Sequence, residues 1–103
     1  MGFAAYPGAR ELCNQHVLGA SQGKRVEIQW RSFASGDTLA DVTAFYIKRD
    51  AKNAQRKSGS LEVHHGEGRI LTASPASNAE LPSCSSKPKT TEKSVIVVST
   101  KIE

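Results

Sequence analysis

One segment of this chain, residues 38–49, agrees with a single local structure and limits the folds that remain open. Thr38 can cap a helix by accepting from the backbone N–H of Asp41, while the Asp41 carboxylate reaches back, an acidic variant of the capping box. Apolar residues at helical spacing then form one stripe that would face a sheet, with Asp41, Thr43 and Lys48 outside it. The stripe consists of Leu39, Val42, Phe45 and Tyr46.

The segment before this helix, residues 25–33, has the alternation of a β-strand. Val26, Ile28 and Trp30 alternate with charged or amide side chains, as in an antiparallel sheet with one covered face. We expect the helix to cover the face that carries these three residues.

Further strands are predicted on both sides of this pair. Residues 10–18 fit a helix or a strand, and the loop of hairpin length at 19–23 favours a strand. A glycine-rich turn lies between two strand-like segments, residues 61–65 and 69–73, and this pattern predicts a second hairpin. Residues 94–102 carry a continuous apolar centre, which indicates a strand inside the sheet.

These elements predict an α+β fold: a mostly antiparallel sheet of four to five strands with one helix packed on one face. At 103 residues the chain is near the commonest domain size, so we expect one domain over residues 6–103. Residues 1–5 are expected to be disordered or foreign to the native chain. The polar residues 50–60 are interpreted as a spacer.

Residues 74–94 are rich in Ser, Pro, Lys and Thr and predict a long loop. Loops of this length are uncommon in compact domains unless they bind something or stay mobile. Cys84 lies in this loop, and the other cysteine is Cys13. A disulfide between them would close a ring worth roughly 4 kcal/mol, although buried free thiols are also common; both states stay open.

The compartment depends on what precedes the chain in the native protein. Residues 1–7 lack the basic region and apolar run of about 7–15 residues that mark a signal peptide. We expect a cytoplasmic protein, or a periplasmic or cell-envelope one if an export signal has been removed. No apolar stretch approaches the ~20 residues needed to cross a bilayer, so we expect no transmembrane segment and a soluble folded part.

The chain is mildly basic, with 14 Lys and Arg against 10 Asp and Glu and a formal net charge of +4. Basic residues gather at positions 48–57 and 87–93. The first group follows the helix, where the macrodipole favours cations, and neither group has interleaved aromatic residues that could stack on bases. Weak nucleic-acid binding is therefore an alternative, not the leading prediction.

The histidines and cysteines are the residues that could form a reactive or metal-binding set. His64 and His65 adjoin on a predicted strand and would point to opposite faces. A metal site would need His16, Cys13 or Glu67 as well, and no local signature indicates a reactive thiol. We assign no catalytic, cofactor-binding or metal residues and no cofactor; a small metal-binding protein or Cys/His enzyme is the alternative.

Two motifs give the chain a resemblance to a group of small bacterial domains that are often exported or lipid-anchored. The group begins with a Tyr-Pro-Gly-Ala turn, here residues 6–9. A strand then precedes a capped helix with the pattern Ser/Thr-Asp-Ser-Pro-Glu-Glu-Val-Val-x-Phe-Tyr, which residues 35–46 match in the cap, the acidic third position, the Val and the Phe-Tyr. The Gly-Trp that often follows the helix is replaced here by residues 58–60, and no lipid-anchor cysteine stands at the amino terminus. The resemblance implies export and assigns no catalytic residue.

Together these observations predict a non-enzymatic domain of unknown partner that acts by surface recognition of a protein or ligand. The sheet edge and the loop at 74–94 are the expected contacts, because no acid, base or nucleophile set is visible and a long loop is kept on a small scaffold.

Overall fold

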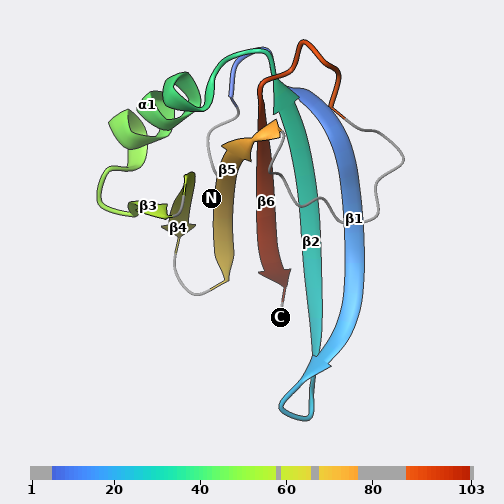
Figure 1. The fold of residues 1–103 in the computed structure, drawn as a ribbon. Coiled ribbons are helices and arrows are strands. Elements are labelled where there is room, and N and C mark those ends of the chain that lie inside the picture. The colour runs from blue at the N-terminus through green and yellow to red at the C-terminus, as the bar shows by residue number, and fades with distance from the viewer. Residues whose placement is uncertain (1–5, 58, 66–67, 77–87, 103) are drawn as a thin grey trace.

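The computed structural model of this protein describes residues 6–57, 59–65, 68–76 and 88–102 (Figure 1). The described chain forms one helix and six strands. In chain order these are β1 (Arg10–Ser21), β2 (Lys24–Ser35), α1 (Leu39–Asp50), β3 (Ala54–Lys57), β4 (Ser60–His65), β5 (Arg69–Pro75) and β6 (Ser94–Ile102).

The strands form one sheet in the order β1-β2-β6-β5-β4-β3, and every neighbouring pair is antiparallel. The last strand of the chain thus lies inside the sheet, between β2 and β5, as its apolar centre predicts. Both predicted hairpins, β1–β2 and β4–β5, are present. The α+β fold class and the helix on one face are confirmed.

The strand number was predicted too low, because the described chain has six strands and not four to five. The missed strand is β3, which lies in the segment interpreted as a spacer. It is short and carries Gln55, Arg56 and Lys57, so it lacks the apolar alternation on which a strand prediction depends. It is an edge strand, where polar side chains are tolerated.

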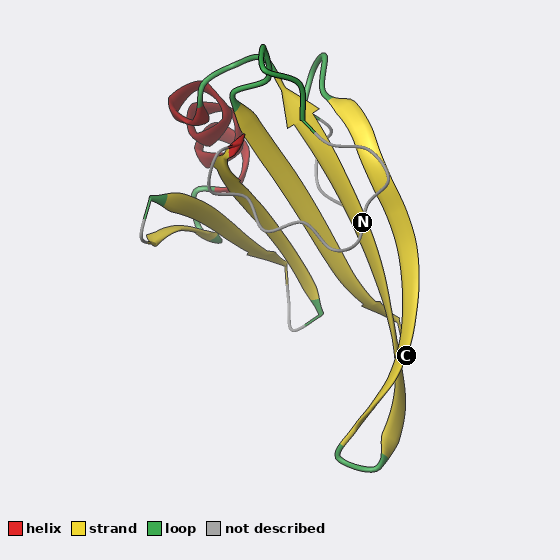
Figure 2. Cartoon of the chain, turned by 45° about the vertical axis from the view of Figure 1, so that its right-hand side comes forward, coloured by secondary structure: helices red, strands yellow, loops and turns green. Residues whose placement is uncertain are grey.

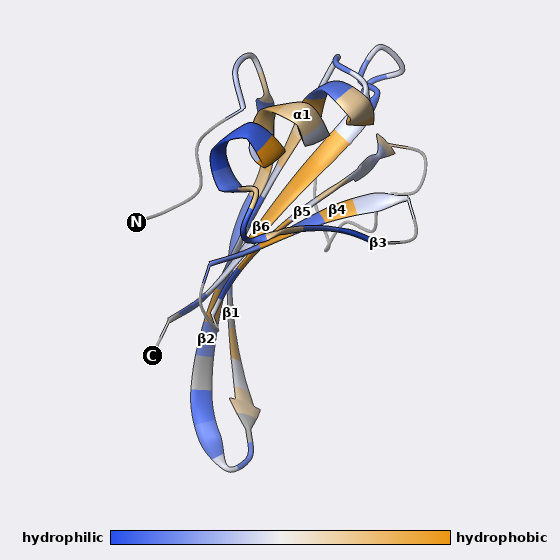
Figure 3. Ribbon diagram, turned by 90° about the vertical axis from the view of Figure 1, so that its left-hand side faces the viewer, coloured by the Kyte–Doolittle hydropathy of each residue, from blue (hydrophilic) through white to orange (hydrophobic). Residues whose placement is uncertain are grey.

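Helix α1 lies across the β3–β4–β5 side of the sheet (Figure 2). Val42 and Tyr46 are fully buried and pack on apolar side chains of the strands beneath them. The ribbon beneath α1 is coloured orange, for hydrophobic residues, in Figure 3. Leu39 and Phe45 pack at the margin of this core, so the predicted stripe is confirmed. Thr43, expected outside the stripe, is also buried. The sheet residues of the core are Leu61, Val63, Leu71, Ala73 and Ile96, with Phe33, Ala54 and Val98 packed against them.

The helix covers the face of β2 opposite to the one expected. Phe33 packs against the helix-side core, and Ile28 and Trp30 differ from it by an odd number of positions, so they face the other way. Both are half-buried on that other face. The expectation failed because alternation shows that a strand has two unlike faces but does not show which one the helix covers.

The start of α1 follows the predicted cap with one difference. The backbone N–H of Asp41 donates to the Thr38 hydroxyl oxygen over 3.3 Å. The Asp41 carboxylate accepts from that same hydroxyl over 3.1 Å, where the capping box places it on the backbone N–H of the cap residue. The helix ends at Asp50, and Lys48 and Arg49 occupy its last turn, where cations are favoured.

The amino-terminal turn packs on the helix. The N–H of Ala9 donates to the carbonyl of Tyr6 over 3.2 Å, and Gly8 has φ of +77°, the geometry that a turn with Pro before Gly requires. The Tyr6 ring lies 5.0 Å from Phe45 and 6.3 Å from Tyr46, measured between ring centroids. The turn therefore packs on α1 at the margin of the core, beside Phe45 and Tyr46.

The predicted loop at 74–94 is shorter at both ends. Ser74 and Pro75 belong to β5, and Ser94 begins β6. Residues 77–87 and 1–5 lie outside the described part of the chain, as do Gly66 and Glu67 of the glycine-rich turn.

Candidate functional site

The two edges of the sheet differ in length and in charge. β3, at one edge, has four residues, and two of them are the basic Arg56 and Lys57. β1, at the other edge, has twelve residues, and from Leu12 to Ser21 it contains no Lys, Arg, Asp, Glu or Pro. Short strands, charged side chains and proline are the usual devices that keep edge strands from pairing with other chains. β3 has two of these devices, and β1 has none of them over that stretch.

The outer side of β1 has no neighbouring strand in the part of the chain that the structure describes. Ser21 pairs with Lys24 across a two-residue turn in which Gln22 and Gly23 have φ of +53° and +76°, a type I′ hairpin turn. Because the pair that closes such a turn is hydrogen-bonded, alternation along the antiparallel ladder directs every second residue's N–H and C=O away from β2. The residues whose backbone groups point outward are Asn14, His16, Leu18 and Ala20.

Side chains at these positions are exposed, because α1 covers only the β3–β5 side of the sheet. Leu18 has 73% of its surface exposed and is the one large apolar residue so exposed among those whose side chains the structure describes. Asn14 accepts from the Gln29 amide over 3.1 Å, and His16 lies 3.9 Å from the Glu27 carboxylate. These neighbours both lie on β2, so neither occupies the outer edge of β1, which no described strand covers.

The hairpin projects beyond the rest of the sheet (Figures 1 and 2). β6 pairs with β2 only from Glu27 to Ser35, so residues 24–26 pair with β1 alone. The candidate site, hereafter the β1 edge, is the outer side of residues 13–21.

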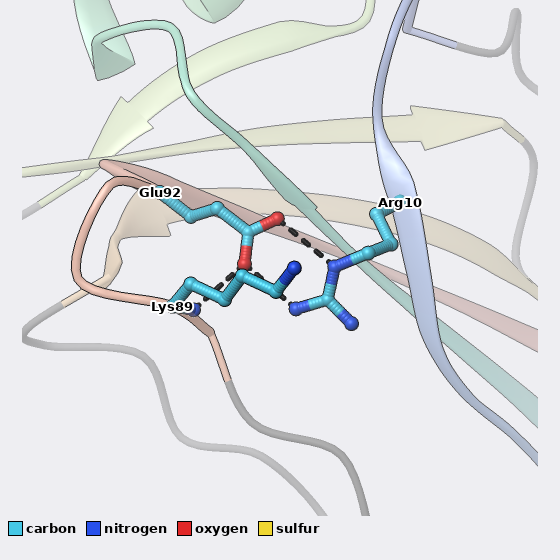
Figure 4. Close-up of polar contacts among 3 residues, drawn as sticks. All are labelled: Arg10, Lys89 and Glu92. Atoms are coloured by element: carbon cyan, nitrogen blue, oxygen red, sulfur yellow. Dashed lines mark hydrogen bonds and ion pairs between the residues drawn. The ribbon is translucent and has the colours of Figure 1, made fainter.

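The opposite end of β1 is fixed to the body of the domain (Figure 4). Arg10 donates to both carboxylate oxygens of Glu92, over 3.2 and 2.7 Å, and the backbone N–H of Lys89 donates to the same carboxylate over 2.7 Å. These bonds, the one from Arg10 first, lower the pKa of Glu92. The strand therefore leaves an anchored end at residue 10 and continues to a projecting tip.

A bulge marks where the anchored end stops. The β1–β2 register shifts between Glu11 and Cys13, and Leu12 between them is buried. A bulge interrupts the regular spacing of outward backbone groups. Regular pairing with another strand is therefore available from Cys13 onward.

The predicted cysteine pair can be placed only in part. Cys13 lies in β1 opposite Ser32, and its side chain is half-buried. Cys84 lies outside the described residues, so the bridge stays a prediction.

Each of the three histidines has a different acidic neighbour, although His64 and His65 are consecutive in β4. His64 Nε2 is 2.9 Å from Glu62 Oε1, and His65 Nε2 is 2.9 Å from Asp50 Oδ1 at the end of α1. His16 lies on the distant β1 edge. Within the described residues no three His, Cys, Asp or Glu side chains gather where they could hold a metal ion.

The sequence predicts contacts at a sheet edge but does not indicate which residues form that edge. The sequence signal for this edge is the uncharged stretch from Leu12 to Ser21 in a chain with 23% charged residues.

No helix in the described chain has the length and apolarity needed to span a membrane.

Comparison of the chain with models of protein families, with curated proteins and with solved structures finds no significant match.

Proposed function

We propose that this domain is a non-enzymatic recognition module that binds an extended polypeptide segment by strand addition to the β1 edge. The contrast between the two edges of the sheet carries the proposal: β3 is short and basic, whereas β1 is long and uncharged from Leu12 to Ser21. A bound strand would pair with the outward backbone groups of residues 14, 16, 18 and 20. Leu18 would supply an apolar contact beside the added strand.

The anchoring of β1 supports this function. Strand addition favours a rigid template, because an edge that must first become ordered loses affinity. The Arg10–Glu92 pair holds one end of β1, and β2 pairs with it from Arg10 to Ser21. The edge is thus already extended before a partner arrives.

A proline substitution tests the backbone contact directly. His16→Pro removes an outward N–H that the β1–β2 ladder does not use, so the fold should persist. The matched control is Arg56→Pro, because the backbone N–H of residue 56 also points away from the sheet, at the β3 edge. The N–H of His64 donates to the Asn53 carbonyl, so the backbone groups of residue 53 face β4. Alternation along the β3–β4 ladder then directs the backbone groups of residue 56 outward.

The probe is a library of random peptides of about 12 residues displayed on phage and selected on protein that is immobilised at low density. We expect the selected peptides to bind the wild type and Arg56→Pro equally, and His16→Pro at least about tenfold more weakly. Peptides that bind His16→Pro as well as the wild type would refute strand addition at this edge.

We also propose that the domain functions in a bacterial cell envelope, with Cys13 and Cys84 bridged. The support is the Tyr-Pro-Gly-Ala turn and helix motif together with two cysteines in a small domain. The codons upstream of the native gene test this: an encoded signal sequence is expected, and a native start at Met1 with no leader would contradict export.

A further inference from the structure

We propose that the partner of the β1 edge is a second copy of this chain, paired antiparallel about a twofold axis at position 17. This inference rests on the proposed function, because it names the strand that is added. Two copies related in this way present the same edge to each other, which is the self-complementary interface of a twofold dimer.

The two ends of the stretch available for pairing set the register of the dimer. It begins at Cys13, after the bulge, and ends at Ser21, before the turn. Full overlap of this stretch with its copy therefore places position 17 opposite itself. In this register the outward residues pair with one another, Asn14 opposite Ala20 and His16 opposite Leu18, so all four contribute backbone hydrogen bonds. A shift of two positions either way loses part of this overlap.

The distribution of charge favours the β1 edge over the β3 edge for contact with a second copy. The chain carries a formal net charge of +4, so two copies have a net electrostatic repulsion. The stretch from Leu12 to Ser21 has no Lys, Arg, Asp or Glu, so no like-charged pair of these residues meets across the axis. The β3 edge would instead bring Arg56 and Lys57 of both copies together.

Leu18 gains a neighbour in this arrangement. Its exposed side chain would lie on the helix side of the sheet, directly opposite His16 of the second copy. Each copy makes this contact once, so the dimer covers two exposed leucines. His16 lies 3.9 Å from the carboxylate of Glu27 of its own copy, and Arg31, two strand pairs further along the same face of β2, is paired with Glu11.

The oligomeric state of the full chain gives the first test. Light scattering over a concentration series should find twice the chain mass for the wild type and for Arg56→Pro. Leu18→Lys and His16→Pro should raise the dissociation constant about tenfold or more, while circular dichroism shows an unchanged fold. A dimer unaffected by both β1 substitutions would overturn the proposal.

Single cysteine substitutions test the register. In a twofold antiparallel pair a residue meets itself only at the axis, so under mild oxidation Val17→Cys should form a cross-linked dimer, whereas His16→Cys and Leu18→Cys should not exceed the wild-type background. Cross-linking at position 16 or 18 would overturn the proposed register.

The peptide selection separates the two proposals. A wild type that stays monomeric throughout, while selected peptides still bind it and lose affinity for His16→Pro, would reject the second copy as partner and keep strand addition. A monomer that also selects no such peptides would reject both.

Discussion

The hydroxyl of Tyr6 donates a 2.6 Å hydrogen bond to the carboxylate of Asp37, which lies 31 positions further along the chain and just before the cap of α1. The same tyrosine ring packs edge-on against Phe45. The two motifs that carry the resemblance, the turn at residues 6–9 and the capped helix, thus contact each other. Their joint presence in the sequence has a structural reason, because each supplies part of the other's packing surface.

Both tyrosines of the chain should resist ionisation in the folded state. The hydrogen bond to Asp37, followed by burial, raises the pKa of Tyr6 to about 12, and burial raises the pKa of Tyr46 to about 12. A raised pKa means that the stabilisation is complete below the unfolded value of about 10 and is lost as the pH rises toward 12. Absorbance titration of the native protein should show little tyrosinate at pH 10–11, whereas the protein in denaturant should titrate near 10.

The variant Tyr6→Phe separates the titration of Tyr46 from that of Tyr6. It leaves Tyr46 as the single titrating tyrosine, so the native amplitude should halve while the midpoint stays high. A native midpoint near 10 in either protein would contradict the contacts described for that ring.

Two leucines should differ sharply in their contribution to stability. Leu71 has 0% exposure and lies in the core beneath α1, while Leu18 is 73% exposed on the β1 edge. Leu71→Ala should lower the free energy of unfolding by about 2–5 kcal/mol, because it removes buried methyl groups and leaves a cavity. Leu18→Ala should change it by less than about 0.5 kcal/mol. Urea unfolding followed by circular dichroism, at a concentration where light scattering finds the mass of one chain, measures both losses. Equal losses would contradict the assigned burial.

The Arg10–Glu92 pair should stabilise the fold at neutral pH and cease to do so in acid. The pKa of Glu92 is lowered in the folded state, chiefly by the hydrogen bond from Arg10. Such a group stabilises the fold above its unfolded pKa of about 4.3 and loses that effect as the pH falls through its lowered folded value. The difference in unfolding free energy between wild type and Glu92→Gln should therefore be largest near pH 7 and shrink below pH 4.

A double-mutant cycle with Arg10→Gln isolates this pair from other effects of either substitution. The coupling between the two positions should be present at pH 7 and should vanish in acid. Coupling that does not change between pH 7 and pH 3 would mean that the carboxylate charge of Glu92 has no part in it.

Local sequence predicted those elements whose signals are local. The cap at Thr38, the apolar stripe of α1 and the apolar centre of β6 each specify their structure within about ten residues, and all three are present. β3 was missed because its strand conformation comes from pairing with β4, and Gln55, Arg56 and Lys57 carry no pattern of their own. The face of β2 that meets the helix depends on how distant segments pack, so Trp30 was placed on the wrong face.

The candidate site depends on the strand order, which local patterns do not give. The sequence shows that residues 12–21 lack charged side chains. This absence indicates a binding edge only because β1 is an edge strand. The same uncharged stretch inside the sheet would be ordinary packing. The histidines illustrate the reverse: three of them invite a metal hypothesis, yet the fold gives each a separate acidic neighbour.

The predicted bridge between Cys13 and Cys84 should be detected as a cooperative effect of two substitutions. Opening the ring with either Cys13→Ser or Cys84→Ser should lower the free energy of unfolding by up to about 4 kcal/mol, because the unfolded chain gains the entropy that the closed loop removes. The double variant should lose no more than about either single one, since one substitution already opens the ring. Thiol titration of the freshly purified wild type should find no free thiol. Two reactive thiols, or losses that add in the double variant, would show that the cysteines act separately, and the proposed place in an oxidising envelope would lose this support.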